Sequence, residues 1–187
     1  SDIDEIVVDE KTAFEHAQEF LQFVMPRFAN RVKFHDNKRP LFHHYAIEEE
    51  IAKIQMKKIP LPMGGSIVIE QTEALVAIDV NSGKTTGDNQ EDTALKTNLD
   101  AAIEIARQLR LRDLAGLIAI DFIDMKLPEN RRKVQESLED FMKTDRARHS
   151  VLPISKFGLL QATRQRIRPE VNINTSEDCP ACVGTGK

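Results

Sequence analysis

Two short apolar runs separated by a long helical stretch constrain the fold of this chain most strongly. Residues 74–80 and the run that begins at Gly116 are rich in aliphatic and β-branched side chains, so each is predicted to be a buried strand. Between them, residues 91–113 carry apolar side chains at spacings of three and four, which indicates an amphipathic helix. Such a unit normally makes its two strands parallel neighbours with a right-handed crossover. We therefore expect an α/β fold with a mixed sheet and flanking helices.

Other elements are predicted on both sides of this unit. Residues 66–70 should form a hairpin with 74–80, and a last strand is expected at 154–160. Loss of regular structure is expected at the breaker cluster 61–65, which we interpret as the main internal boundary, and in the loop 81–89. Helices are predicted at 9–29, interrupted by Pro26, and at 48–57 and 128–148.

Composition fits a globular protein without a membrane span. The chain is 41% hydrophobic and 30% charged, with a formal net charge of −4. Its apolar runs fall short of the roughly 18–20 residues that a spanning helix needs. The acidic start does not resemble a secretory signal, so we expect a cytoplasmic protein. Because the chain begins without Met and stops just after a cysteine motif, we also expect a fragment of a longer protein.

Aspartates stand at the ends of both apolar runs. Asp79 ends the first run and Asp121 the second, so parallel strands would bring both carboxylates to one edge of the sheet. Paired carboxylates suit a hard cation such as Mg²⁺. Asn81 lies two residues beyond Asp79 and should share its face, where it could orient that carboxylate or contact a substrate. The alternative is structural, since Asp79, Asp121 and Asp124 could simply cap turns or pair with basic side chains.

The stretch from residue 143 to residue 168 is strongly basic within an acidic protein. It suits contacts with phosphates, which carry most of the affinity for nucleic acids. The plainer alternative is a solvated surface with ordinary salt bridges. The basic side chains of this stretch are Lys143, Arg146, Arg148, Lys156, Arg164, Arg166 and Arg168.

Lys84 lies in the loop that follows Asp79 and could also contact a phosphate. The sequence around it, Ser-Gly-Lys-Thr-Thr, lacks the glycine-rich run of a P-loop. We therefore exclude nucleotide hydrolysis of that type.

The two cysteines form a single Cys-x-x-Cys motif. Cys179 and Cys182 can supply half of a tetrahedral zinc site, and the chain has no further cysteine. A second copy of the chain could supply the other two thiolates. A thioredoxin-like redox pair is disfavoured, because that motif needs a strand before it and a helix after it.

Together these segments resemble the ribonuclease E/G family of bacterial endoribonucleases. The resemblance covers the chain well from about residue 38 onward. Its matching blocks are residues 40–45, 64–70, 72–75, 77–82, 97–102, 104–114, 120–125 and 145–148, together with the cysteine motif.

The resemblance implies both a domain organisation and an activity. Residues 1–55 would be part of an RNase H-like subdomain, 56–175 a DNase I-like catalytic subdomain, and 176–187 a zinc-link segment. Asp79 and Asp121 would bind the catalytic Mg²⁺ with Asn81 steadying Asp79, while Cys179 and Cys182 would join two protomers through Zn²⁺. The substrate would be single-stranded RNA. From their charge, we expect the phosphates of such an RNA to be contacted by Lys84, Arg146, Arg148, Lys156, Arg164 and Arg166.

Two other functions remain open at this point. The chain could be a non-catalytic RNA-binding and oligomerisation scaffold in which the aspartates are structural. It could also be a nuclease or phosphodiesterase that acts on DNA, although no histidine lies beside the aspartates in sequence.

Overall fold

The computed structural model describes residues 3–83 and 90–168. The chain divides into two compact units, Ser1–Met56 and Lys57–Lys187. Cys179, Cys182 and Lys84 lie outside the described residues. None of the described helices is long and apolar enough to cross a membrane.

Unit 1 contains a pair of short parallel strands with helical segments. Strands β1 (Ile6–Val8) and β2 (Val32–Phe34) pair, and α1 (Lys11–Val24) and the 3-10 helix η1 (Pro26–Arg31) lie between them in sequence. The Glu10 carboxylate caps α1 by accepting from the backbone N–H groups of Thr12 and Ala13. The predicted helix 9–29 is split before Pro26, because proline has no N–H to continue the α-helical hydrogen bonds. Helices α2 (Leu41–His44) and α3 (Ile47–Gln55) follow.

Unit 2 is built on a six-stranded mixed sheet with the order β3-β4-β5-β6-β8-β7. The predicted parallel pairing is confirmed, since β5 and β6 are parallel neighbours, whereas the other pairs in this sheet are antiparallel. The strands are β3 (Lys58–Pro60), β4 (Ser66–Gln71), β5 (Val76–Asn81), β6 (Gly116–Asp121), β7 (His149–Val151) and β8 (Leu159–Arg164).

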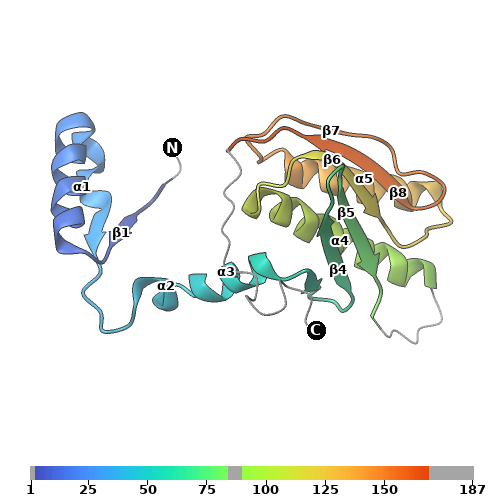
Figure 1. Cartoon of the computed structure of the whole chain (residues 1–187), viewed down its shortest axis with the longest axis horizontal. Coiled ribbons are helices and arrows are strands. Elements are labelled where there is room, and N and C mark those ends of the chain that lie inside the picture. Colours follow the sequence, from blue (N-terminus) through green and yellow to red (C-terminus); the bar gives the residue numbers. More distant parts are fainter. Residues whose placement is uncertain (1–2, 84–89, 169–187) are drawn as a thin grey trace, which may run out of the picture. The chain divides into compact units, whose positions relative to one another are not determined.

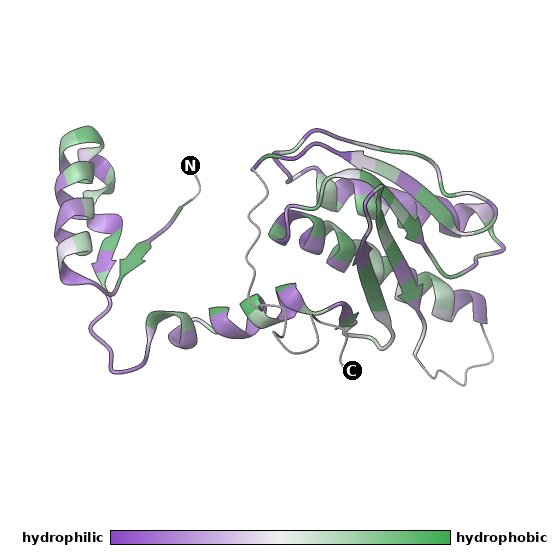
Figure 2. Cartoon of the chain, in the orientation of Figure 1, coloured by the Kyte–Doolittle hydropathy of each residue, from purple (hydrophilic) through white to green (hydrophobic). Residues whose placement is uncertain are grey.

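Two helices cover one face of this sheet. Helices α4 (Gln90–Leu111) and α5 (Pro128–Met142) pack against each other and against the strands (Figure 1). Along β5 and β6, buried apolar side chains alternate with more exposed residues, so the buried ones share one face of the sheet. Green hydrophobic stretches run along β4 and β5 (Figure 2). The core below the helices includes Ile67, Ile78, Ile118, Ile120, Ile105, Leu109, Val134, Leu138 and Leu160. The expected α/β fold with a mixed sheet and flanking helices is thus confirmed.

Three predicted elements differ from the structure. The cluster 61–65 is a tight turn between β3 and β4 inside unit 2, rather than a boundary, with Gly64 and Gly65 at positive φ. Helix α5 ends at Met142, short of residue 148, and beyond this end the Asp145 carboxylate accepts from the backbone N–H of Ala147 in a local turn. The last strand begins at Leu159 and not at residue 154.

Candidate metal centre and basic surface

The two aspartates that end the apolar runs are direct neighbours across the sheet. Asp79 and Asp121 are Cα partners near the carboxyl ends of β5 and β6. Adjacent strands lie about 4.8 Å apart, so both side chains leave the sheet side by side. Ile78 and Ile120 next to them are buried under the helices, whereas Asp79 and Asp121 are exposed on the opposite face. The structure thus brings both predicted carboxylates together in an accessible position.

Asn81 lies on the same side of β5 and holds the first carboxylate. Its Nδ2 donates to Asp79 Oδ2 at 2.6 Å. This hydrogen bond restricts the rotation of the Asp79 side chain and leaves the Asn81 amide oxygen on the same face. Of the two possibilities that the sequence left open for Asn81, the structure therefore shows the orienting contact.

The chemistry of these side chains fits Mg²⁺ bound in one particular way. Mg²⁺ is commonly held by one or two carboxylates, with waters and substrate phosphate oxygens completing its octahedral shell. Asp79 and Asp121 supply such a partial shell. Within residues 3–83 and 90–168, no group of three or more His, Cys, Asp or Glu side chains is arranged to hold a metal ion. A cation at this edge would therefore need ligands from water or substrate.

The segment that follows Asp121 is fixed by two side chains of α4. Asn98, which is fully buried, donates to the carbonyl of Ile123 at 2.8 Å and accepts from its N–H at 3.0 Å. The Glu91 carboxylate accepts from the N–H groups of Lys126 and Leu127 and from the Asn130 side chain. The Lys126 N–H and the Asn130 amide hold the pKa of Glu91 below its ordinary value. Sequence reasoning missed both residues, since only their polarity on the helix could have drawn attention to them.

The turn between β3 and β4 packs tightly against the end of β5. A methyl group placed on Gly65 would lie 2.5 Å from the carbonyl oxygen of Asn81 and 3.2 Å from a Thr97 methyl. Because no side chain fits there, glycine at this position lets the turn support the backbone that carries Asn81 and Asp79.

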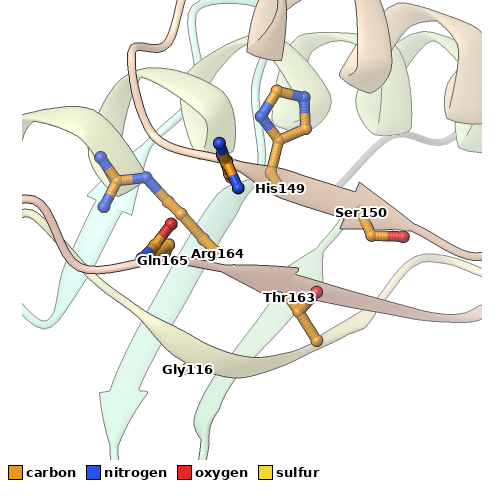
Figure 3. Close-up of a pocket in the computed structure, with 7 residues that line it drawn as sticks. Gly116, His149, Ser150, Thr163, Arg164 and Gln165 are labelled. Atoms are coloured by element: carbon orange, nitrogen blue, oxygen red, sulfur yellow. The ribbon is translucent and has the colours of Figure 1, made fainter.

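Most of the described basic candidates are accessible. Arg146, Arg148, Lys156 and Arg166 are exposed, which agrees with a role in contacting phosphates. Arg148 also contributes to a shallow hollow of about 440 Å³. Figure 3 shows Gly116, Ser150 and Thr163 around it, on three neighbouring strands. Gly116 and Asp121 lie at opposite ends of β6, roughly 16 Å apart at 3.3 Å per residue, so this hollow is separate from the aspartate pair.

Arg164 requires a correction, because its side chain is buried. Only 2% of it is exposed, and its guanidinium binds Asp145 through Nε at 2.7 Å and Asp113 through Nη1 at 2.7 Å. It also donates to the carbonyl of Leu114 at 2.9 Å. The predicted RNA contact is therefore replaced by a structural role, since the hydrogen-bonding groups already serve the fold.

Comparison with known proteins agrees with the resemblance seen in the sequence. The model of the Ribonuclease E/G family matches residues 1–167. Ribonuclease E of Haemophilus influenzae is 51% identical over a match that covers 100% of this chain and 20% of that protein. Ribonuclease E of Escherichia coli is 47% identical, with 99% of this chain and 18% of that protein covered. Ribonuclease G of Escherichia coli is 38% identical, with 100% and 38% covered. The chain thus spans about a fifth of the length of these ribonuclease E relatives.

Proposed function

The chain belongs to the ribonuclease E/G family, and from this premise we propose that it forms the catalytic region of a Mg²⁺-dependent endoribonuclease that cleaves single-stranded RNA. The observation that carries the proposal is the register of Asp79 with Asp121 at one exposed sheet edge, with Asn81 bonded to Asp79. Neither the sheet nor the helix layer needs two exposed carboxylates side by side, where like charges repel. Such a pair is explained by binding a cation.

Each group at this edge has a defined task in the proposed reaction. Asp79 and Asp121 would hold the cation, and Asn81 keeps the Asp79 carboxylate in place. A bound Mg²⁺ supplies polarisation of water and stabilisation of the charge that develops on the scissile phosphate. Asn98 and Glu91 hold the backbone of the segment that follows Asp121, at Ile123 and Lys126, which would help to keep Asp121 in position.

RNA binding is assigned to the exposed basic residues. Arg146, Arg148, Lys156 and Arg166 would contact phosphates, and Lys84 in the loop after Asp79 would join them. Such contacts position the strand and do not read its sequence. The family resemblance further supports a DNase I-like catalytic subdomain that begins near residue 56, close to the division of the chain at Met56, preceded by part of an RNase H-like subdomain. Cys179 and Cys182 would bind a structural Zn²⁺ together with the same pair of a second copy.

The test is single-turnover cleavage of an end-labelled, AU-rich single-stranded RNA with the chain in excess and Mg²⁺ present. Asp121→Asn and Asp79→Asn should each slow cleavage by about 10²-fold or more, since the cation contributes several kcal/mol to the transition state. RNA binding should persist. Glu73→Gln is the matched control, because it removes an exposed carboxylate that precedes the opposite end of β5.

The possible outcomes separate the proposal from its rivals. Cleavage by the unsubstituted chain and by Glu73→Gln, but not by the two Asn variants, supports the assigned site. Equal rates of cleavage by the unsubstituted chain and by Asp121→Asn would refute the assigned site. RNA binding without cleavage by the unsubstituted chain would favour a scaffold, and cleavage of a matched DNA oligomer at the same rate would favour a nuclease of broader specificity.

A further inference from the structure

Phe157 is a large aromatic side chain that the fold leaves in solvent. Its exposed fraction is 84%, and it lies in the connection between β7 and β8. A single exposed apolar residue is common on protein surfaces and needs no explanation by itself. Its turn and its location beside the aspartate pair set Phe157 apart.

The turn that carries Phe157 is held by several hydrogen bonds. The N–H of Gly158 donates to the carbonyl of Ser155 at 3.2 Å, which closes a turn with Lys156 and Phe157 at its tip. The Ser155 hydroxyl oxygen accepts from the N–H groups of Phe157 at 3.3 Å and Leu159 at 3.2 Å. The tip is therefore a defined structure that presents its two side chains to solvent.

This turn is fastened to the segment that follows Asp121. The carbonyl of Gly158 accepts from the N–H of Phe122 at 3.1 Å, and Leu159 is the Cα partner of Asp121. Gly158 has a φ of +76°, and a methyl group on it would lie only 2.4 Å from the carbonyl oxygen of Phe122. Asp79, Asp121 and Leu159 are Cα partners across three neighbouring strands, and Phe157 stands two residues before Leu159 in the sequence.

An exposed aromatic ring next to a cation is the combination that binds single-stranded nucleic acids. A base stacks on the ring irrespective of its identity, while the cation contacts the adjoining phosphate. Lys156 is exposed beside Phe157 at the same turn tip. One ring and one ammonium offer far less area than the roughly 800 Å² per partner of a standard protein interface. A nucleobase needs only one face of the ring.

We propose that Phe157 is a stacking platform for one nucleobase of single-stranded RNA, close to the phosphate that lies at the Asp79–Asp121 pair, with Lys156 contacting a neighbouring phosphate. The inference rests on the proposed function and adds a positioning residue to it. By immobilising one base, the ring sets which phosphate of the strand lies at the aspartates.

Binding measurements test this separately from cleavage. All variants are made in the Asp121→Asn background so that the RNA stays intact, and Kd is measured by fluorescence anisotropy at constant salt. Phe157→Ala should weaken binding by roughly 5- to 150-fold, the range found for loss of one base–aromatic stack. Phe157→Tyr keeps a ring and should bind like the parent, whereas Phe157→Leu keeps apolar bulk and should lose most of the affinity. The side chain is exposed, so the thermal midpoints of all variants should agree.

A series of RNAs that each lack one base identifies the partner of the ring. Removing the stacked base should weaken binding to the parent as much as Phe157→Ala does, and Phe157→Ala should then cause no further loss on that RNA. Abasic sites elsewhere should leave the effect of Phe157→Ala unchanged.

Several results would overturn the stacking proposal. The first is an unchanged Kd for Phe157→Ala. The second is a Kd of Phe157→Leu that equals that of Phe157→Tyr. The third is a loss of affinity by Phe157→Ala that is the same on every abasic RNA. An unchanged Kd together with an altered sedimentation coefficient would show that the turn docks onto protein instead. Cleavage of the same RNA is measured in parallel with the chain that keeps Asp121. If that chain cleaves RNA but Phe157→Ala leaves Kd unchanged, only the stacking proposal fails; if that chain binds RNA without cleaving it, the endoribonuclease proposal fails. If the chain bound no RNA at all, both would fall.

Discussion

Removing the Arg164 guanidinium should destabilise unit 2 more than any surface substitution. This side chain bonds to Asp145 with two nitrogens, at 2.7 and 3.2 Å, and to Asp113 at 2.7 Å. The exposed fraction of the side chain is 2% for Arg164, 3% for Asp145 and 22% for Asp113, so water cannot replace the lost contacts easily. The ion pairs join the end of β8 to the backbone after α4 and to the segment after α5.

The magnitude follows from the charges that would be left behind. Arg164→Met fills much of the aliphatic volume but leaves Asp145 and Asp113 without their cation. Removing one partner of a buried ion pair typically costs about 3–5 kcal/mol. Arg164→Lys should recover only part of this loss, because one ammonium cannot reproduce the planar fork that binds both carboxylates. The triple variant Arg164→Met, Asp145→Asn, Asp113→Asn should also recover part of the lost stability, since the two Asn substitutions remove the uncompensated charges.

The effect should depend on pH in a defined direction. Burial raises the pKa values of Asp145 and Asp113, but hydrogen bonds from Arg164 and from backbone N–H groups, together with the charge of Arg164, outweigh it, and both pKa values lie below the ordinary value. A carboxyl group with a lowered pKa in the folded state stabilises that state above its unfolded pKa, about 3.9 for Asp, and loses this contribution as the pH falls through the folded pKa. The difference between the unsubstituted chain and Arg164→Met should therefore be complete near pH 7 and shrink below about pH 4.

Urea denaturation followed by far-UV circular dichroism measures this difference. The chain has no Trp and one Tyr, so fluorescence is a poor probe. If the two units unfold in separate transitions, only that of unit 2 should shift. A loss below about 1 kcal/mol at pH 7, the range of exposed ion pairs, or a loss that does not change with pH, would refute this reasoning.

Two further predictions concern the segment after Asp121 and the cysteines. Asn98→Ala leaves the N–H and carbonyl of Ile123 without their partner, so it should cost about 1–3 kcal/mol per group and slow RNA cleavage. Equal stability of Asn98→Ala and the unsubstituted chain in urea denaturation would contradict this role. Each copy of the chain supplies only half of the proposed zinc site. A zinc-selective chelator, or the substitution Cys179→Ser, should therefore convert dimers to monomers in analytical ultracentrifugation. An unchanged sedimentation coefficient in a protein shown to contain zinc would exclude a shared ion.

Local patterns in the sequence predicted the element types of unit 2 well. The apolar runs that end in Asp79 and Asp121, and the helical spacing between them, were sufficient to expect parallel strands with both carboxylates at one edge. The short strands β1, β2, β3 and β7 were missed, because three residues are too few to show a period of two. The end of α5 was missed because residues 143–148 contain neither Gly nor Pro to signal it.

By itself, the sequence determined the kind of element at each long apolar run and the residue types at its ends, because periodicity and turn chemistry act over a few residues. Only the tertiary structure decided which side chains meet. Arg164 and Arg166 look alike in a basic stretch, yet one is buried between two carboxylates and the other is exposed. The alignment of Asp121 with Leu159 likewise depends on strand register, and it places the turn of Phe157 beside the aspartates. Register and burial arise from packing between segments far apart in the chain, which no local pattern encodes.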